Sequence, residues 1–306
     1  MKRYPGRWLA VLLSCMALHI LMYTSVFAAV TNTWPGADGG TVQALAINPS
    51  DNTTLYAGTE FGGVYKSTNS GGSWTAVNNG ITNFNVQDLA INPSTPSNLY
   101  AGTAGGGVFK STTSGDSWTA MNNGLTSLNV QALVIDPDVN TTLYAGTNGG
   151  GVFTTAGCGA AEWCPTAPLP PGTNVQALAI NPPGKASALY AGTEADGVFK
   201  STDGGTSWTD IDNAVLPSNE NVLALTVDPS ANSTVYAGTS GDGVFITTNG
   251  GTSWSAIVIG LPGISVSNAI VRALVYDPGL TTAYAGMDST GVFTTAGCLT
   301  TDWCPS

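Results

Sequence analysis

Three short segments decide the fold of this chain: Leu55-Tyr56-Ala57-Gly58-Thr59, then Gly63-Val64-Tyr65-Lys66-Ser67-Thr68, then Gly71-Gly72-Ser73-Trp74. Apolar and β-branched runs that are interrupted by glycine-rich turns favour short strands joined by hairpins. The same segments return in the same order five more times before the C-terminus. The chain is therefore built from six copies of one unit.

The period of the repeat predicts the architecture. The tyrosine of the Tyr-Ala-Gly motif recurs every 44 to 48 residues, at Tyr56, Tyr100, Tyr144, Tyr190, Tyr236 and Tyr284. Each unit also has an apolar run before this motif and a short run after the glycine-rich turn, which makes four strands. We therefore predict an all-β fold, a six-bladed β-propeller of four-stranded antiparallel blades. The blades are expected at about 41–84, 85–128, 129–173, 174–220, 221–269 and 270–306.

The N-terminal segment differs from the repeats. Lys2, Arg3 and Arg7 precede an apolar run from residue 8 to about 23, and small residues follow at Ala28. This layout predicts a signal peptide, residues 1–28, and a secreted protein, extracellular or periplasmic. The alternative is that the run is retained as a membrane anchor. Residues 29–40 include Thr31-Asn32-Thr33-Trp34, which we expect to pair at the edge of the sixth blade and close the ring.

The charge of the mature chain excludes several functions. Without residues 1–28, five Lys and Arg remain of eight, against 19 Asp and Glu, so the net charge is near −14. A surface this acidic disfavours nucleic acid and anionic membranes as partners. The single histidine, His19, also leaves with the signal peptide. We therefore expect no histidine-dependent catalysis, no metal and no cofactor.

Four cysteines remain after cleavage, in two pairs with the same spacing. They are Cys158 and Cys164 in the third repeat, and Cys298 and Cys304 in the sixth. Paired cysteines in an exported chain predict disulfides. Zinc binding is the competing interpretation, but neither pair has the Cys-x-x-Cys spacing and the two pairs lie in distant repeats.

The turn before the fourth strand carries the most specific motif. Ser201-Thr202-Asp203-Gly204-Gly205-Thr206-Ser207-Trp208 fits S-x-D-x-G-x-x-W, the Asp box. The chain thus resembles the BNR/Asp-box propellers, which include sialidases, sortilin-type receptors, xyloglucanases and photosystem II assembly factors. The resemblance implies that these turns are structural and lie on the face away from the ligand. The other copies place Asn69, Asn249 or Thr113 at the Asp position, and the tryptophans that fold over the turns are Trp74, Trp118, Trp208 and Trp254.

The ligand site is expected on the opposite face. There the inner strands begin, each with one residue that we expect at the mouth of the central channel: Gln43, Gln87, Gln131, Gln176, Leu223 and Arg272. A neutral interpretation is that the glutamines only solvate this mouth. We predict instead that Arg272 and the glutamines, together with the loop residues Asp196 and Asp242, bind an anionic or polar ligand.

Two functional classes remain open. We favour a monomeric, non-enzymatic interaction module that binds a protein or a glycan. The alternative is an inverting, two-carboxylate glycoside hydrolase resembling xyloglucanases, with Glu194, Asp242 and Asp288 as candidate catalytic residues. Sialidases hold their substrate with three arginines, and the mature chain has one, so sialidase activity is not expected.

Overall fold

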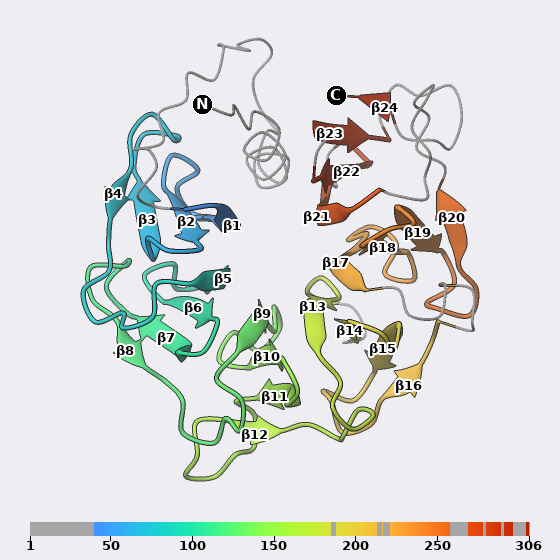
Figure 1. The fold of residues 1–306 in the computed structure, drawn as a ribbon, viewed down its shortest axis with the longest axis horizontal. Coiled ribbons are helices and arrows are strands. Elements are labelled where there is room, and N and C mark those ends of the chain that lie inside the picture. The colour runs from blue at the N-terminus through green and yellow to red at the C-terminus, as the bar shows by residue number, and fades with distance from the viewer. Residues whose placement is uncertain are drawn as a thin grey trace.

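The computed structural model describes residues 40–184, 188–212, 216, 221–257, 269–277, 280–288, 291–295 and 304–305. These residues form six four-stranded antiparallel sheets, which stand side by side as blades around a common centre (Figure 1). The predicted fold class and blade number are confirmed. None of the described residues forms a helix that could cross a lipid bilayer.

The strands follow one another in every blade from the centre outward. Blade one holds β1 (Val42–Ile47), β2 (Leu55–Thr59), β3 (Val64–Ser67) and β4 (Thr75–Ala76). Blade two holds β5 (Val86–Ile91), β6 (Leu99–Thr103), β7 (Gly107–Ser111) and β8 (Thr119–Ala120). Blade three holds β9 (Val130–Ile135), β10 (Leu143–Thr147), β11 (Gly151–Thr154) and β12 (Cys164–Pro165).

The second half repeats this order. Blade four holds β13 (Val175–Ile180), β14 (Leu189–Thr193), β15 (Val198–Ser201) and β16 (Thr209–Asp210). Blade five holds β17 (Val222–Val227), β18 (Val235–Thr239), β19 (Val244–Thr247) and β20 (Ser255–Ile257). Blade six holds β21 (Val271–Asp277), β22 (Thr282–Met287), β23 (Gly291–Thr294) and β24 (Cys304–Pro305).

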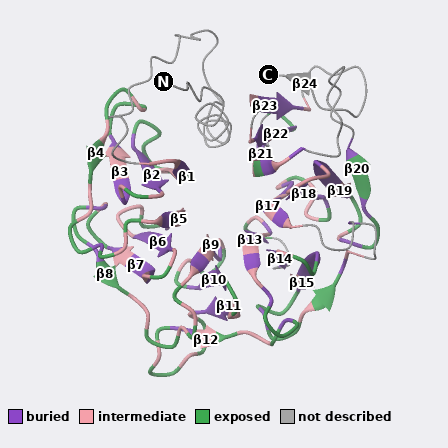
Figure 2. Ribbon diagram, viewed as in Figure 1, coloured by how far each residue is buried: buried purple, intermediate pink, exposed green. Residues whose placement is uncertain are grey.

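The apolar core lies between neighbouring blades. One cluster joins Ala44, Tyr56 and Val64 of blade one to Leu89 and Phe109 of blade two. The second strands of blades one to five are buried along their whole length (Figure 2), and in blades two to five a neighbouring blade lies on each side. Burying a large apolar side chain contributes roughly 1.5–3 kcal/mol. The stability of each blade therefore depends on its neighbours.

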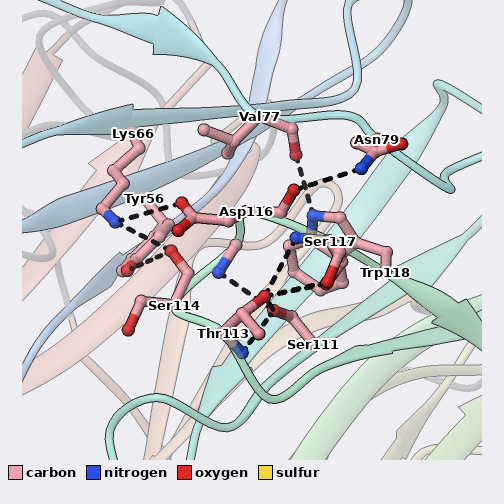
Figure 3. Close-up of polar contacts among 11 residues, drawn as sticks. Tyr56, Lys66, Val77, Asn79, Ser111, Thr113, Ser114, Asp116, Ser117 and Trp118 are labelled. Atoms are coloured by element: carbon pink, nitrogen blue, oxygen red, sulfur yellow. Dashed lines mark hydrogen bonds and ion pairs between the residues drawn. The ribbon is translucent and has the colours of Figure 1, made fainter.

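Tryptophans join blades two, three, four and five to the blade before each of them. The indole Nε1 of Trp118 in blade two donates to the carbonyl of Val77 in blade one at 2.8 Å (Figure 3). Trp163 and Trp254 make the equivalent bonds to Met121 and Ile211, at 2.8 Å and 2.7 Å. Buried indole N–H groups need such partners, so these bonds fix the distance between outer strands.

The same interface contains a lysine. Lys66 Nζ lies 5.7 Å from the ring centre of Tyr56 and donates to the carbonyl of Ser114 in the next blade at 2.9 Å (Figure 3). The hydroxyl of Tyr56 donates to the same carbonyl at 3.0 Å. Blade one therefore holds the turn of blade two through both polar and apolar contacts.

The turns between the third and fourth strands share one stabilising contact. In blade four, Oδ1 of Asp203 accepts the backbone N–H of Ser207 at 2.9 Å. Asn69 and Asn249 accept the equivalent N–H in blades one and five, and the hydroxyl of Thr113 does so in blade two, at 2.8, 2.9 and 3.0 Å. Three residue types thus close the same turn. Of the accompanying tryptophans, Trp118 and Trp254 are buried, while Trp74 and Trp208 are half-buried.

A disulfide replaces that contact in blade three. Cys158 and Cys164 are bonded, with their Cα atoms 5.2 Å apart, as the spacing predicted. The equivalent pair in blade six, Cys298 and Cys304, is not tested, because Cys298 lies outside the described residues, as does the side chain of Cys304. The zinc alternative is wrong for Cys158 and Cys164.

Adjacent blades contact one another in sequence from blade one to blade six. Contacts between inner strands link β1 to β5, β5 to β9, β9 to β13, β13 to β17 and β17 to β21. Within the described ranges, no contact of comparable extent links β1 to β21. The closing segment expected at 29–40, the signal peptide and Trp303 all lie outside the described residues, apart from residue 40.

Candidate ligand site at the channel mouth

A β-bulge near the start of each inner strand builds the site. In every blade the inner strand pairs with the second strand in the same register, and the register shifts at its second residue. A bulge leaves one residue unpaired and re-aims its side chain. The six bulged residues are Gln43, Gln87, Gln131, Gln176, Leu223 and Arg272.

These six residues surround one space. They all line a cavity of about 330 Å³ at the centre of the propeller, which we call the channel cavity. Asp88, Met287 and Asp288 also line it. The residues that the sequence predicted as a ring are therefore brought together, and they differ chemically from blade to blade.

The channel cavity opens on the face that carries the loops between second and third strands. The backbone N–H of Glu60, Glu194 and Asp288 donates to the carbonyl of the residue at or just before the start of the inner strand, at 2.9 to 3.0 Å. At the opposite end, the N–H of Ser70 donates to Thr53, which lies in the turn between first and second strands. The turns between the third and fourth strands and the channel mouth are thus on opposite faces.

Arg272 forms an ion pair at this mouth. Its Nη2 lies 3.4 Å from Oδ2 of Asp288, which follows β22 in the same blade. The Arg272 side chain is 45% exposed, and Asp288 is the only partner that the described part of the chain provides for its guanidinium. A guanidinium carries five N–H donors, and most of them have no partner among the described residues.

Two of the glutamines are held by asparagines. Nε2 of Gln131 donates to Oδ1 of Asn129 at 2.7 Å, and Gln87 makes the same bond to Asn85 at 2.5 Å. Because the amide nitrogen is used in this way, the carbonyl oxygen of each glutamine is left to accept a hydrogen bond. The mouth therefore combines fixed acceptors with the donors of Arg272.

Asp88 is a site residue that the sequence analysis missed. Its Oδ1 accepts the N–H of Leu89 at 2.8 Å, and its Oδ2 accepts the N–H of Leu133 in blade three at 2.6 Å. Burial raises the pKa of Asp88 to about 7, against the opposing effect of these two hydrogen bonds. The side chain keeps a little water-accessible surface because it lines the channel cavity, although protein atoms surround it.

A signal for Asp88 exists in the aligned repeats. The residue after the bulge is Ala44, Ala132, Ala177, Ala224 and Ala273 in the other five blades. A carboxyl group at a position that alanine fills in the other five blades indicates a role besides packing.

Three of the acidic loop residues, Glu194, Asp196 and Asp242, do not line the channel cavity. Glu194 accepts a hydrogen bond from the amide of Asn174, and Asp196 accepts one from the hydroxyl of Thr173 at 3.0 Å. Both line a separate, shallow depression in blade four. The backbone N–H of Asp242 donates to Thr239 at 3.1 Å, and Asp242 lines neither space. Of the three candidate catalytic carboxylates, Glu194, Asp242 and Asp288, the channel cavity includes one.

Known structures share the fold. The chain matches no protein-family model and no curated protein sequence. It superposes on the GH74 xyloglucanase from Xanthomonas campestris with a TM-score of 0.66 and 18% identity, over 83% of this chain and 44% of that one. The extracellular domain of the putative one component system BT4673 from B. thetaiotaomicron gives 0.64 and 18%, over 85% and 33%.

A third neighbour is closer in length. YCF48 bound to D1 peptide superposes with a TM-score of 0.59 and 13% identity, over 83% of this chain and 76% of that one. The chain spans less than half of the xyloglucanase. At these identities the likeness shows the propeller fold.

Proposed function

We propose that this protein is an exported, non-enzymatic β-propeller of the BNR/Asp-box type that binds a protein or glycan ligand at its channel mouth. The observation that carries this proposal is the set of six bulges, which re-aim chemically different residues into one cavity on the loop face. On the opposite face, by contrast, four blades repeat one turn contact. Variation on a rigid scaffold is where binding usually resides.

Two structural neighbours support a binding role. One is the extracellular domain of a putative one component system, and another is YCF48 bound to D1 peptide. Their names describe those proteins, and they illustrate that this fold serves recognition outside enzymes.

The arrangement of carboxylates favours a binder over a glycosidase. An inverting glycosidase needs two carboxyl groups that face each other roughly 6.5–9.5 Å apart across the scissile bond. Here Asp288 is paired with Arg272, and Glu194 lies at a separate depression. Each is held by contacts within its own blade, which supports a structural or ligand-positioning role.

Export rests on the N-terminal sequence. We propose that cleavage after Ala28 releases a mature chain beginning at Ala29. Mass spectrometry of the protein from the culture medium or periplasm tests this. A mass that includes residues 1–28 would indicate an anchor instead.

The binding experiment uses arrays of glycans and of extracted surface proteins. The purified mature protein is applied beside Arg272→Ala and Asp242→Ala, with Asp116→Asn as the control, because Asp116 lies in the turn of blade two on the opposite face. Signals that weaken at least tenfold in Arg272→Ala and persist in Asp116→Asn support the proposed site. If Arg272→Ala and Asp242→Ala both retain the full signals, the ligand binds elsewhere.

A further inference from the structure

The channel already binds one carboxylate, which belongs to the protein itself. The two oxygens of Asp88 each accept a backbone N–H, from Leu89 in its own inner strand and from Leu133 in the inner strand of the next blade. The N–H groups on the free edge of neighbouring inner strands are therefore spaced to hold a carboxylate between two blades.

The other blades present the same N–H groups. Leu89 pairs with Ala101 and Leu133 with Ala145, and the equivalent residues Leu178, Leu225 and Leu274 pair with Ala191, Ala237 and Ala285. Because N–H direction alternates along a strand, an identical register gives an identical direction. The N–H groups of Leu178, Leu225 and Leu274 thus also point from the inner edge toward the channel. Leu45, their counterpart in blade one, already has an interaction, and the proposal does not use it.

The lining of the channel cavity agrees with this geometry. Leu178, Leu225 and Leu274 reach the cavity, whereas Leu89 and Leu133, whose N–H groups Asp88 covers, do not. Blades four to six have Ala177, Ala224 and Ala273 in place of Asp88, so the volume that a carboxylate fills beside blade two is left to the cavity.

Arg272 places a positive charge next to these donors. It lies two residues before Leu274 on β21 and lines the same cavity. Hydrogen bonds in which the acceptor is ionised are roughly twice as strong as neutral ones, and arginine adds bidentate geometry. The side of the channel cavity formed by blades five and six therefore combines two backbone donors with a guanidinium.

We propose that this side of the channel cavity binds the carboxylate of a sugar acid, with the N–H groups of Leu225 and Leu274 and the guanidinium of Arg272 as its donors. This inference deepens the proposed function and rests on it. Gln43, Gln87, Gln131 and Gln176 of blades one to four line the same cavity with amides, which match the hydroxyl groups of a sugar. A cavity of about 330 Å³ accepts one terminal sugar residue.

The proposed carboxylate site is tested by reproducing the Asp88 contact of blade two in blade five. Ala224→Asp gives blade five the residue that blade two has naturally, and its carboxylate is expected to occupy the donors of Leu225 and Leu274. Ala76→Asp makes the same chemical change on the exposed outer strand β4 and serves as the matched control. Arg272→Gln installs the residue that four other blades have at the bulge, so the fold is expected to persist.

Isothermal titration calorimetry compares galacturonate, galactose and a short peptide with a free C-terminal carboxylate. The proposal predicts that wild type and Ala76→Asp bind galacturonate at least tenfold more tightly than galactose or the peptide. Ala224→Asp and Arg272→Gln are expected to lose at least tenfold in affinity for galacturonate. Circular dichroism and the thermal midpoint establish that each variant is folded.

The outcomes distinguish a failure of the sugar-acid inference from a failure of the proposed function. Equal affinity for galacturonate and galactose, both weakened by Arg272→Gln, would overturn the sugar-acid inference while supporting a ligand site at the mouth. Preference for the peptide would overturn it in favour of a protein ligand. Full binding of galacturonate by Ala224→Asp would overturn the assignment of the donors, and array signals insensitive to Arg272 would overturn the proposed function itself.

Discussion

The backbone N–H of Leu133 in blade three donates a hydrogen bond of 2.6 Å to Oδ2 of Asp88 in blade two. Together with the bond from Leu89, this contact places a carboxyl group between two inner strands, inside the channel cavity. One acidic side chain thus joins two blades and shows how backbone N–H groups of neighbouring inner strands hold a carboxyl group.

The first prediction concerns Asp88 and pH. Its folded-state pKa of about 7 lies above the ordinary value of 3.8, because burial disfavours the charged form. The folded protein therefore holds a proton that the unfolded chain has lost, and stability falls as pH rises from about 4 through 7. The loss is at most roughly 4 kcal/mol, and water in the cavity reduces it.

Asp88→Asn removes this titration. Urea denaturation at pH 4.5, 6 and 8 gives the free energy of unfolding of both proteins. As pH rises, the wild type is expected to lose stability relative to the variant. Other carboxyl groups also titrate; hydrogen bonds from Ser207 and Ser201, for example, lower the pKa of Asp203. Their effect on stability is the same in both proteins and cancels in the difference. A pH-independent difference would contradict the prediction.

The second prediction concerns the indole contacts between blades. Trp118→Phe keeps most of the buried ring but removes the bond to the carbonyl of Val77. We expect the free energy of unfolding to fall by about 1–3 kcal/mol, because the carbonyl loses its partner. Trp208→Phe is the comparison. Its bond to the hydroxyl of Thr166 is longer, at 3.2 Å, and its ring is half-buried, so a smaller loss is expected. Equal losses would contradict this ranking.

The third prediction concerns the disulfide of blade three. Replacing both Cys158 and Cys164 by serine opens a short loop, and the loop-entropy relation gives a loss of about 2 kcal/mol. Guanidinium denaturation measures it. Replacing Asn69 by alanine in the turn of blade one tests the comparison between a covalent and a hydrogen-bonded closure. A double serine variant as stable as wild type would show that the disulfide does not stabilise the turn.

The fourth prediction concerns Gly124. Its φ is +101°, and an added Cβ would collide with the backbone carbonyl of Trp163 in the next blade. Gly124→Ala is therefore expected to lose about 1–2 kcal/mol from the backbone conformation and more from the forced shift of the neighbouring blade. Gly157→Ala also has positive φ, but nothing lies within 4 Å of its added Cβ, so only the first loss is expected. Thermal midpoints of the two variants give the comparison.

The sequence predicted the fold because the repeat encodes it many times over. The period of Tyr56 and its counterparts determined the six blades, and the apolar runs determined their strands. The position of Gln43 and its counterparts at the start of each inner strand was also readable. The bulge that turns these side chains into one cavity was not, because it depends on pairing with the second strand.

The electrostatics of the site depend on tertiary contacts that no local pattern encodes. Asp88 stands out only when the repeats are aligned, and its contact with Leu133 spans two blades. The backbone donors of Leu225 and Leu274 have no sequence signature at all. Conversely, Glu194 and Asp196 looked equivalent to Asp288 in the aligned loops, but Asn174 and Thr173 hold them at a different depression.

The central claim is that the channel cavity binds the carboxylate of a sugar acid. The most direct test is a ¹⁵N–¹H correlation spectrum of the mature protein, recorded during a titration with galacturonate. Our account predicts that the backbone amide signals of Leu178, Leu225 and Leu274 shift on binding, while those of Leu89 and Leu133 shift far less because Asp88 already occupies them. Shifts confined to the turns between third and fourth strands, or the absence of any shift among the three channel amides, would contradict it.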